Sequence, residues 1–359
     1  MKKFNGFLAL ILAIVCIFVG AFGGGYFYLE SHGFSSDIYS GDFSVHFMEL
    51  GNKYTGDCTY IKAGDVDILI DAGSRVDSIP HITEYVNKFV TDGILEYVIV
   101  THAHEDHYAG FATNESTDSI FDIYECKTII DFAQTNQSGK KMYNDYLRER
   151  DAEIAKGATH YTAKQCIDEG KSVFELADGI TMTILDQKYY HQKASDGEND
   201  HSVCTLFTVG NENFLFTGDL EEKGEKSLIE KNELPKVSLY KAGHHGSKTS
   251  SCPEFMQVIQ PEVVCVCCCC GSPEYTDIEE NQFPTQIFID NVAPYTDAVY
   301  VTTISEDDDY KNGIFSSMNG NIVVTCGGGV LTVTCSASDK KLKDTDWFKT
   351  HRVTPNAWS

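Results

Sequence analysis

Basic residues are scarce in this sequence. Its 359 residues include 28 lysines and arginines against 53 aspartates and glutamates, so the formal net charge is −25 at pH 7. Basic side chains occur in adjacent pairs at most, such as Lys140-Lys141 and Lys340-Lys341. Proteins that hold nucleic acid tightly neutralise its phosphates with clusters of lysine and arginine. We therefore expect no tight nucleic-acid binding, although a metal centre can still attract one phosphate group locally.

Several other signals are also absent. The sequence has no internal repeat and no glycine-rich nucleotide-binding motif, and its serines lack an evident base partner, which disfavours a serine nucleophile.

Among its 13 cysteines, the run Cys265–Cys270 lacks the spaced CxxC pairs of a structural zinc site. Adjacent residues of a strand point to opposite faces, so these thiols do not readily pair. We interpret 263–270 as a buried strand in which cysteine serves as a small hydrophobic residue.

The first thirty residues differ from the rest. Lys2 and Lys3 precede residues 4–29, which include no charged side chain. This segment is long enough to span a bilayer as a helix, and the lysines favour a cytoplasmic N-terminus. A cleaved signal peptide is the alternative, because small residues occur around 21–23. The aromatic cluster 26–28 favours an uncleaved anchor, so we expect a membrane-attached extracytoplasmic domain, or a secreted one after cleavage.

The remaining chain alternates between strand-like and helix-like periodicity. Strands are expected at 43–50, 59–62, 66–71, 97–100, 180–185, 203–209, 214–217, 236–242, 263–270, 298–304, 321–326 and 330–335. Helices are expected at 80–90, 142–155, 221–232 and 253–259. Two groups of strands with helices between them predict a layered sandwich. The expected organisation is an anchor or signal segment at 1–30, a linker at 31–42, a folded domain at 43–335 and a polar, loosely held tail at 336–359.

Four candidate metal ligands lie within six residues, namely His102, His104, Asp106 and His107. They directly follow the apolar segment 97–100, so a strand would deliver them to one point at a sheet edge. Neutral imidazole and carboxylate suit Zn²⁺ and similar divalent ions, which turn water into a nucleophile near neutral pH. A polar loop with histidines by chance is the alternative, and the density of ligands disfavours it. The motif therefore indicates a metal centre that activates water.

Two later positions extend this motif. Asp219 follows the segment 214–218, where a strand-end carboxylate can bridge two metal ions, although a plain turn aspartate fits a Gly-Asp sequence equally well. His244 and His245 follow another apolar segment. Adjacent residues of a strand point opposite ways, so we expect one of the two to bind metal, and we favour His244.

The order of these motifs resembles the metallo-β-lactamase superfamily, and more narrowly the hydrolase domain of ComEC-type competence proteins. The resemblance spans roughly 44–335. It depends on separated motifs in a shared order: Val45-His46-Phe47, Gly56-Asp57, His102–His107, Asn199-Asp200-His201-Ser202-Val203, Thr217-Gly218-Asp219 and His244-His245-Gly246-Ser247. It implies an α+β fold, a four-layer αββα sandwich, for residues 43–335.

The resemblance also implies a metal-ligand set. His102 and His104 would hold one ion, Asp106 and His107 the other; Asp219 would bridge them, and His244 or His245 would complete the second site. His201 is a less certain further ligand, because ComEC-type sequences place asparagine at the corresponding segment. Asp71 is expected to orient the metal-binding histidines rather than to bind metal. The implied cofactor is a pair of divalent ions, Zn²⁺ with Mn²⁺ as the alternative.

We therefore predict a metal-dependent hydrolase that acts on a phosphodiester or another ester, such as nucleic acid or a cell-surface polymer. Asp106 or a residue of the His-His-Gly-Ser motif would manage protons. A β-lactam or lactone is the alternative substrate. A non-catalytic surface binding module on the same fold is the alternative from another class of function.

Overall fold

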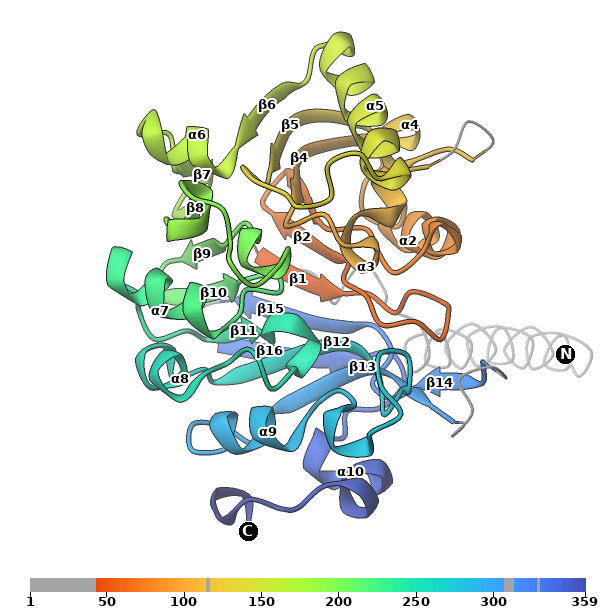
Figure 1. The fold of residues 1–359 in the computed structure, drawn as a ribbon, viewed down its shortest axis with the longest axis vertical. Coiled ribbons are helices and arrows are strands. Elements are labelled where there is room, and N and C mark those ends of the chain that lie inside the picture. The colour runs from red at the N-terminus through yellow and green to blue at the C-terminus, as the bar shows by residue number, and fades with distance from the viewer. Residues whose placement is uncertain (1–42, 114–116, 307–312, 328–329) are drawn as a thin grey trace, which may run out of the picture. The chain divides into compact units, whose positions relative to one another are not determined.

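Two mixed β-sheets form the frame of the molecule (Figure 1). The structure is a computed structural model in which residues 43–113, 117–306, 313–327 and 330–359 are described. These residues belong to one compact unit, Gly41–Ser359. The predicted anchor or signal segment at 1–30 and the linker at 31–42 lie outside the described residues.

The first sheet combines an antiparallel half with a parallel half. Its strands are β1 (Phe43–Phe47), β2 (Thr59–Ala63), β3 (Val66–Ile70), β4 (Ile94–Val100), β5 (Glu125–Asp131), β6 (Thr159–Thr162), β15 (Ile322–Gly327) and β16 (Val330–Cys335). Their order is β16-β15-β1-β2-β3-β4-β5-β6. The pairs from β3 to β6 are parallel, so the carboxyl ends of these strands meet at one edge of the sheet.

The second sheet has the same mixed character. Its strands are β7 (Val173–Ala177), β8 (Ile180–Ile184), β9 (Thr205–Val209), β10 (Glu212–Phe216), β11 (Leu239–Lys241), β12 (Val263–Cys270), β13 (Val299–Ser305) and β14 (Phe315–Ser317). Their order is β14-β13-β12-β11-β10-β9-β8-β7. The strands β10 to β13 run parallel to one another.

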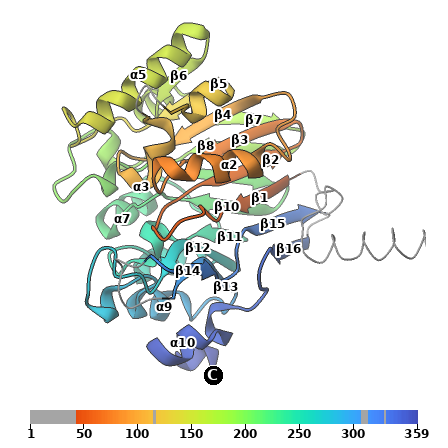
Figure 2. The same ribbon diagram turned by 90° about the vertical axis from the view of Figure 1, so that its right-hand side faces the viewer.

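Helices lie beside both sheets (Figures 1 and 2). They are α2 (Ile79–Val86), α3 (Glu105–Tyr108), α4 (Ile120–Ile123), α5 (Lys141–Lys156), α6 (Ala163–Asp168), α7 (Glu222–Lys231), α8 (Pro253–Ile259), α9 (Gln286–Val292) and α10 (Asp346–His351). Helices α2, α4 and α5 lie beside the first sheet, and α7, α8 and α9 beside the second (Figure 1). The fold is α+β, as the sequence predicts.

The core between the sheets is aromatic. Phe43 and Phe47 of β1 pack against the second sheet, with ring centroids of Phe43 and Phe214 4.7 Å apart and those of Phe47 and Phe216 6.2 Å apart. All four side chains are essentially inaccessible to water. Burial of such rings contributes several kcal/mol in total, at about 25 cal/mol per Å² of apolar surface, so the two sheets are held firmly against each other.

The cysteine run occupies the expected buried strand. All eight residues of β12 are buried, and β12 has parallel neighbours on both sides. Strands covered on both faces favour continuous apolar sequences. Every cysteine in the described ranges is a free thiol, which confirms the interpretation of this run as small hydrophobic residues.

The C-terminal segment is packed, so the expectation of a loosely held tail at 336–359 is wrong. Leu342, Phe348 and Trp358 are buried and belong to a hydrophobic cluster that includes residues of α8, α9, β12 and β13. The indole of Trp358 also donates a hydrogen bond to the Thr296 carbonyl at 2.8 Å. Three apolar side chains spaced along a polar segment are enough to fix it to the core.

Among the described residues, no helix combines the length and apolar character needed to cross a bilayer.

Candidate metal centre

The predicted site residues gather where strands of both sheets end. Asp71 directly follows β3, and His102 comes two residues after β4. From the second sheet, Asp219 follows β10, and His244 and His245 follow β11. Carboxyl ends of parallel strands are common places for ligand sites because the chain leaves the sheet there and exposes polar groups. The topology therefore brings distant parts of the sequence to one point.

A short backbone network fixes the loops around this point. The Asp57 amide donates to the Asp106 carbonyl at 2.9 Å, and the Gly73 amide donates to the Asp57 carbonyl at 3.0 Å. The Ala72 amide donates to the His107 carbonyl at 2.7 Å. Three loops that are far apart in the sequence are thus tied together through main-chain bonds, which holds their side chains in place.

Four buried residues form the centre of the site. One ligand atom from each of Asp57, His107, Asp219 and His245 lies within 4.8 Å of the others. Asp219 Oδ2 is 3.1 Å from His107 Nε2 and 3.3 Å from His245 Nε2. The two Nε2 atoms are themselves 3.3 Å apart. All four side chains are nearly inaccessible to solvent.

The hydrogen bonds of the His107 and His245 imidazoles show which of their nitrogen atoms face Asp219. His107 Nδ1 lies 2.8 Å from Asp71 Oδ2, and His245 Nδ1 lies 2.8 Å from the Cys267 carbonyl oxygen. Both partners only accept, so each Nδ1 carries a proton and each Nε2 is the atom turned toward Asp219. A proton on Nε2, or a metal ion in its place, would pair these nitrogens with the carboxylate.

Unpaired carboxylate oxygens support the same conclusion. Oδ1 of Asp219 and Oδ1 of Asp57 are buried and accept no hydrogen bond, although His245 Nδ1 lies 3.3 Å from the latter. Buried acceptors without partners are rare unless an ion or water satisfies them. Imidazole nitrogen and carboxylate oxygen are suitable ligands for divalent ions such as Zn²⁺, so the residues present fit a metal.

The electrostatics of the cluster also favour a cation. Burial opposes protonation of His107, but the carboxylates of Asp219, Asp57 and Asp71 raise its pKa to about 10. Burial likewise opposes ionisation of Asp219, whereas the neighbouring imidazoles of His107 and His245 hold its pKa well below its usual range. The carboxylate field that attracts a proton to these rings attracts a divalent ion in the same way.

Asp106 borders this centre. Its Oδ2 lies 3.3 Å from His245 Nε2. Burial alone would raise the pKa of Asp106, but the bond to His245 and the charge of His107 lower it strongly. The predicted proton-handling residue is therefore an ionised carboxylate beside the cluster.

His102 and His104 form an adjacent pair. His102 Nε2 lies 3.1 Å from His104 Nδ1 and 3.9 Å from Asp219 Oδ2. His102 Nδ1 is 3.2 Å from Thr101 Oγ1, a hydroxyl that donates to Asp71 Oδ2 at 2.7 Å. Asp219 Oδ2 thus lies near His102 as well as near His107 and His245; the bridging role of Asp219 stays a prediction.

His244 and His245 both turn toward Asp219. They lie in a 3-10 turn, Gly243–Gly246, with positive φ angles of 45° and 54°, so the premise of an extended strand with opposite side-chain directions does not hold here. His244 Nε2 is 3.9 Å from Asp219 Oδ2, against 3.3 Å for His245 Nε2. The sequence favoured His244 as the ligand, whereas the four-residue group contains His245.

His201 is a predicted ligand that does not belong to the four-residue group at the centre of the site. It is buried in a 3-10 turn, Asn199–His201. Burial lowers the pKa of His201, and the nearby charge of Glu198 opposes this shift. The neighbouring Asn199 faces the site instead, with its Nδ2 3.4 Å from His244 Nδ1 and its Oδ1 buried without a hydrogen bond.

Sequence reasoning missed three residues at the site. Lys241 is buried beside Asp57 and Asp219, and a charged residue at the end of an apolar strand was an available signal for it. Asp57 was noticed only as part of a motif. Tyr275, whose hydroxyl donates to Asp106 at 2.7 Å, lies in a loop without a distinctive pattern.

Two helix-flanked mixed sheets carry a His/Asp cluster at the ends of their strands, and part of the chain is similar to competence and recombination proteins. A family model described as "Anti-Pycsar protein Apyc1" matches residues 49–238, which is 190 of the 359 residues. The chain belongs to this family.

Curated relatives match smaller parts of the chain. The chain is 31% identical over 103 residues to ComE operon protein 3 of Bacillus subtilis, a stretch that covers 28% of this chain and 13% of that protein. It is 30% identical over 115 residues to recombination protein 2 of Haemophilus influenzae, covering 32% of this chain and 14% of the relative. The chain thus matches about a seventh of the length of these relatives.

The chain is also similar to a solved structure. The metallo-β-lactamase fold protein YhfI from Bacillus subtilis aligns with a TM-score of 0.43 and 11% identity, over 76% of this chain and 98% of that one.

Proposed function

We propose that this chain is a hydrolase that binds divalent metal ions in the His/Asp cluster and cleaves a phosphodiester with activated water. One observation carries the proposal. The Nε2 atoms of His107 and His245 and the Oδ2 atom of Asp219 face one another within 3.3 Å inside the protein. Imidazole nitrogens and a carboxylate gathered this closely inside a protein suit a divalent ion, which would take the place of the protons on the two Nε2 atoms.

The ligand atoms suit divalent metal ions. Asp57, His107, Asp219 and His245 would hold one ion, with Asp106 beside them. His102 and His104, with His244 near Asp219, would hold a second ion. Nitrogen and oxygen donors suit Zn²⁺, with Mn²⁺ as the alternative.

Bound metal ions and Asp106 would have different roles in the proposed reaction. Bound divalent ions supply Lewis acidity, which polarises the ester and makes water a nucleophile near neutral pH. Asp106 borders the cluster, with its Oδ2 3.3 Å from His245 Nε2, and because of this position we assign it to accept the proton of the attacking water. The water oxygen forms the new bond to phosphorus, the ester P–O bond breaks, and the leaving oxygen takes up a proton.

The substrate class follows from the relatives and from charge. The names of the curated relatives, a competence operon protein and a recombination protein, favour phosphodiesters of nucleic acid as the first class to test. A net charge of −25 disfavours tight binding of long polyanions. The uncharged segment 4–29, outside the described residues, supports attachment to a membrane or export across it.

The decisive experiment combines metal analysis with two chromogenic substrates. The purified protein is loaded with Zn²⁺ or Mn²⁺, and hydrolysis of bis-p-nitrophenyl phosphate and of a chromogenic β-lactam is measured. We expect metal-dependent turnover of the diester, a loss of at least about 100-fold in His104→Ala, and no effect of the control His191→Ala, whose side chain pairs with Asp186.

Two results would contradict the proposed function. Less than one equivalent of bound metal at micromolar concentration would indicate a binding module without catalytic activity. Turnover of the β-lactam without turnover of the diester would replace the proposed substrate class.

A further inference from the structure

The loop that follows β12 contributes to the wall of the candidate metal centre. This 271–284 loop starts after Cys270 and ends just before Thr285, which caps α9. The Phe283 ring centroid lies 5.7 Å from that of His244 and 5.8 Å from that of His245. The loop thus places an aromatic side chain directly against the two histidines that follow β11.

Polar contacts hold the inner side of the loop. Oε2 of Glu274 accepts a hydrogen bond from the Thr55 amide at 2.8 Å, and Oε1 pairs with the Arg75 guanidinium at 3.0 Å. The Glu274 side chain is only 4% exposed. These contacts tie the loop to the segments that also carry Asp57 and Asp71.

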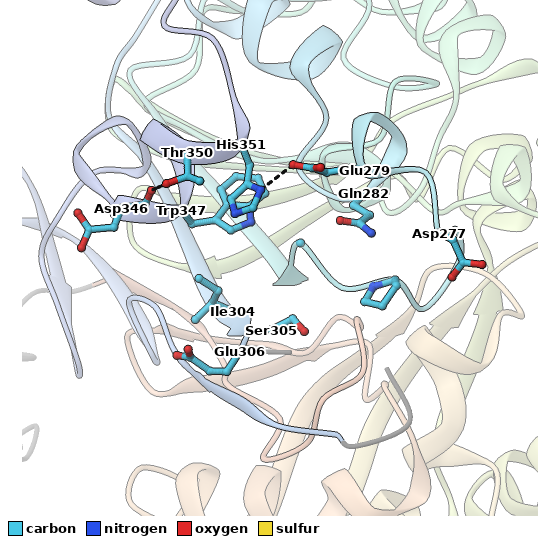
Figure 3. A pocket seen from close by; sticks show the side chains of 12 residues that line it. Asp277, Glu279, Gln282, Ile304, Ser305, Glu306, Asp346, Trp347, Thr350 and His351 are labelled. Atoms are coloured by element: carbon cyan, nitrogen blue, oxygen red, sulfur yellow. Dashed lines mark hydrogen bonds and ion pairs between the residues drawn. The ribbon is translucent and has the colours of Figure 1, made fainter. Parts of the chain in front are cut away.

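The outer side of the loop is fixed to the C-terminal segment. Arg352 donates to the Pro284 carbonyl at 3.0 Å and to the Gln282 carbonyl at 2.8 Å. Here the loop borders a cavity of about 530 Å³. His351 and Glu279 line this cavity, and His351 Nδ1 lies 2.6 Å from Glu279 Oε1 (Figure 3). Because both sides are held, the side chains that the loop presents to the metal centre are positioned in advance.

Tyr275 lies at the boundary between this centre and solvent. The residue is 53% exposed, yet its hydroxyl donates a hydrogen bond of 2.7 Å to Asp106 Oδ2. The same oxygen is 3.3 Å from His245 Nε2. The ring packs on Phe283, with centroids 5.7 Å apart. A neutral O–H donor is thus held at the open edge of the cluster.

This placement differs from that of a structural tyrosine. A tyrosine that serves the core buries its ring and satisfies its hydroxyl inside, as Tyr146 does with Asp131 at 2.8 Å. Tyr275 leaves about half of its surface to solvent and directs its only polar atom at the site. A donor fixed where negative charge develops stabilises the transition state without reorganisation.

We propose that Tyr275 is a catalytic residue that donates its phenolic hydrogen bond to the substrate oxygen on which negative charge develops. In the resting site Asp106 accepts this bond, and the substrate oxygen replaces Asp106 as acceptor during the reaction. The phenol keeps its proton throughout, so no covalent bond to Tyr275 forms or breaks. The role rests on the proposed hydrolase function.

The test compares wild type with Tyr275→Phe, which removes one oxygen atom from a half-exposed side chain. With bis-p-nitrophenyl phosphate we expect kcat to fall about 100-fold, while KM and bound metal stay within about twofold. Ile278→Ala, which alters an exposed residue of the same loop, should leave both constants unchanged. Equal melting temperatures of the three proteins would establish that folding is intact.

A second readout does not depend on turnover. Orthovanadate, a tetrahedral oxyanion that can adopt a five-coordinate geometry like that of a phosphoryl transition state when it is bound, is titrated into the metal-loaded proteins by calorimetry. Loss of one hydrogen bond to it should weaken binding by Tyr275→Phe about tenfold, with Ile278→Ala binding as wild type does.

The outcomes separate the two proposals. A wild-type protein without metal-dependent turnover overturns the hydrolase function and the role of Tyr275 with it. An active wild type together with an equally active Tyr275→Phe overturns the role of Tyr275 alone. Parallel losses of bound metal and kcat in Tyr275→Phe would show that the hydroxyl only holds Asp106, and would also overturn the catalytic role.

Discussion

The Lys241 ammonium group forms a buried ion pair with the Asp57 carboxylate inside the candidate metal centre. Lys241 Nζ is also 3.8 Å from Asp219 Oδ1 and 3.4 Å from the Gly218 carbonyl oxygen. Burial opposes protonation of this lysine, but Asp57 and Asp219 raise its pKa, so it stays charged. A fixed positive charge therefore balances one carboxylate of the cluster independently of any metal.

Removing this charge should destabilise the protein strongly. Lys241→Met leaves Asp57 ionised and buried without its lysine partner, with only the imidazoles of His107 and His245 nearby, and we expect the free energy of unfolding in urea to fall by about 3–5 kcal/mol. The double variant Lys241→Met/Asp57→Asn removes both charges and should recover much of that loss. Lys231→Met, which breaks the solvent-exposed pair with Asp186, should cost less than about 1 kcal/mol. A double variant no more stable than Lys241→Met would contradict this account of the pair.

Asp71 should control metal affinity without touching the metal. Its carboxylate accepts from His107 Nδ1 at 2.8 Å and from the Thr101 amide at 2.8 Å. Asp71 has a φ of 59°, a conformation that asparagine also tolerates. Asp71→Asn therefore preserves the backbone but weakens the hydrogen bond from the His107 imidazole. We expect metal affinity to fall 10- to 100-fold, measured by competition with a chromophoric chelator. Asp92→Asn, in an exposed turn, should bind metal like wild type.

The strands and most candidate ligands were predictable because their signals are local. Apolar runs such as 97–100 form buried strands, and the polar residues directly after them leave the sheet at its edge. His102 and Asp219 come shortly after strand ends in this way, whereas His107 lies in α3 and was recognised from its spacing in the motif. The order of motifs then indicated the superfamily, and the observed α+β fold agrees with it.

The rest of the site depends on tertiary contacts that no local pattern encodes. Lys241 meets Asp57 only because β11 and the loop after β1 belong to different sheets that pack together. The side-chain directions of His244 and His245 depend on left-handed backbone angles, which the apolar–polar pattern does not reveal. The C-terminal residues were misjudged because three buried apolar side chains are hidden in a polar segment.

Close backbone packing gives Gly73 a structural role that can be tested. A Cβ atom on Gly73 would lie 1.9 Å from the Asp106 carbonyl oxygen, so the Asp106–His107 segment would have to move. We expect Gly73→Ala to lower the free energy of unfolding by about 1–3 kcal/mol and to reduce bound metal, measured by elemental analysis. Gly327→Ala is the matched control, because its Cβ would meet no atom within 4 Å. Full metal content in Gly73→Ala would show that the segment adapts without disturbing the ligands.

Buried His46 should make the protein sensitive to acid. The imidazole bonds Ser44 and Tyr85, and burial lowers the pKa of His46 to about 3, against 6.5 in the unfolded chain. Between these values the unfolded chain binds a proton that the folded protein excludes, so this contribution to stability is complete above pH 6.5 and is lost as the pH falls toward 3.

The slope of stability against pH isolates this effect from the other histidines. For wild type, the His46 contribution to the free energy of unfolding should fall by about 1.4 kcal/mol per pH unit well inside that window. His46→Phe should be less stable at pH 7, because the Tyr85 and Ser44 hydroxyls lose a hydrogen-bond partner. Its free energy of unfolding should change less steeply with pH, because the contribution of His46 is absent. Urea unfolding of both proteins at pH 7.5, 6 and 5 measures the difference, in which the histidines shared by the two proteins cancel. Parallel slopes would mean that the folded protein admits a proton at His46 as readily as the unfolded chain does.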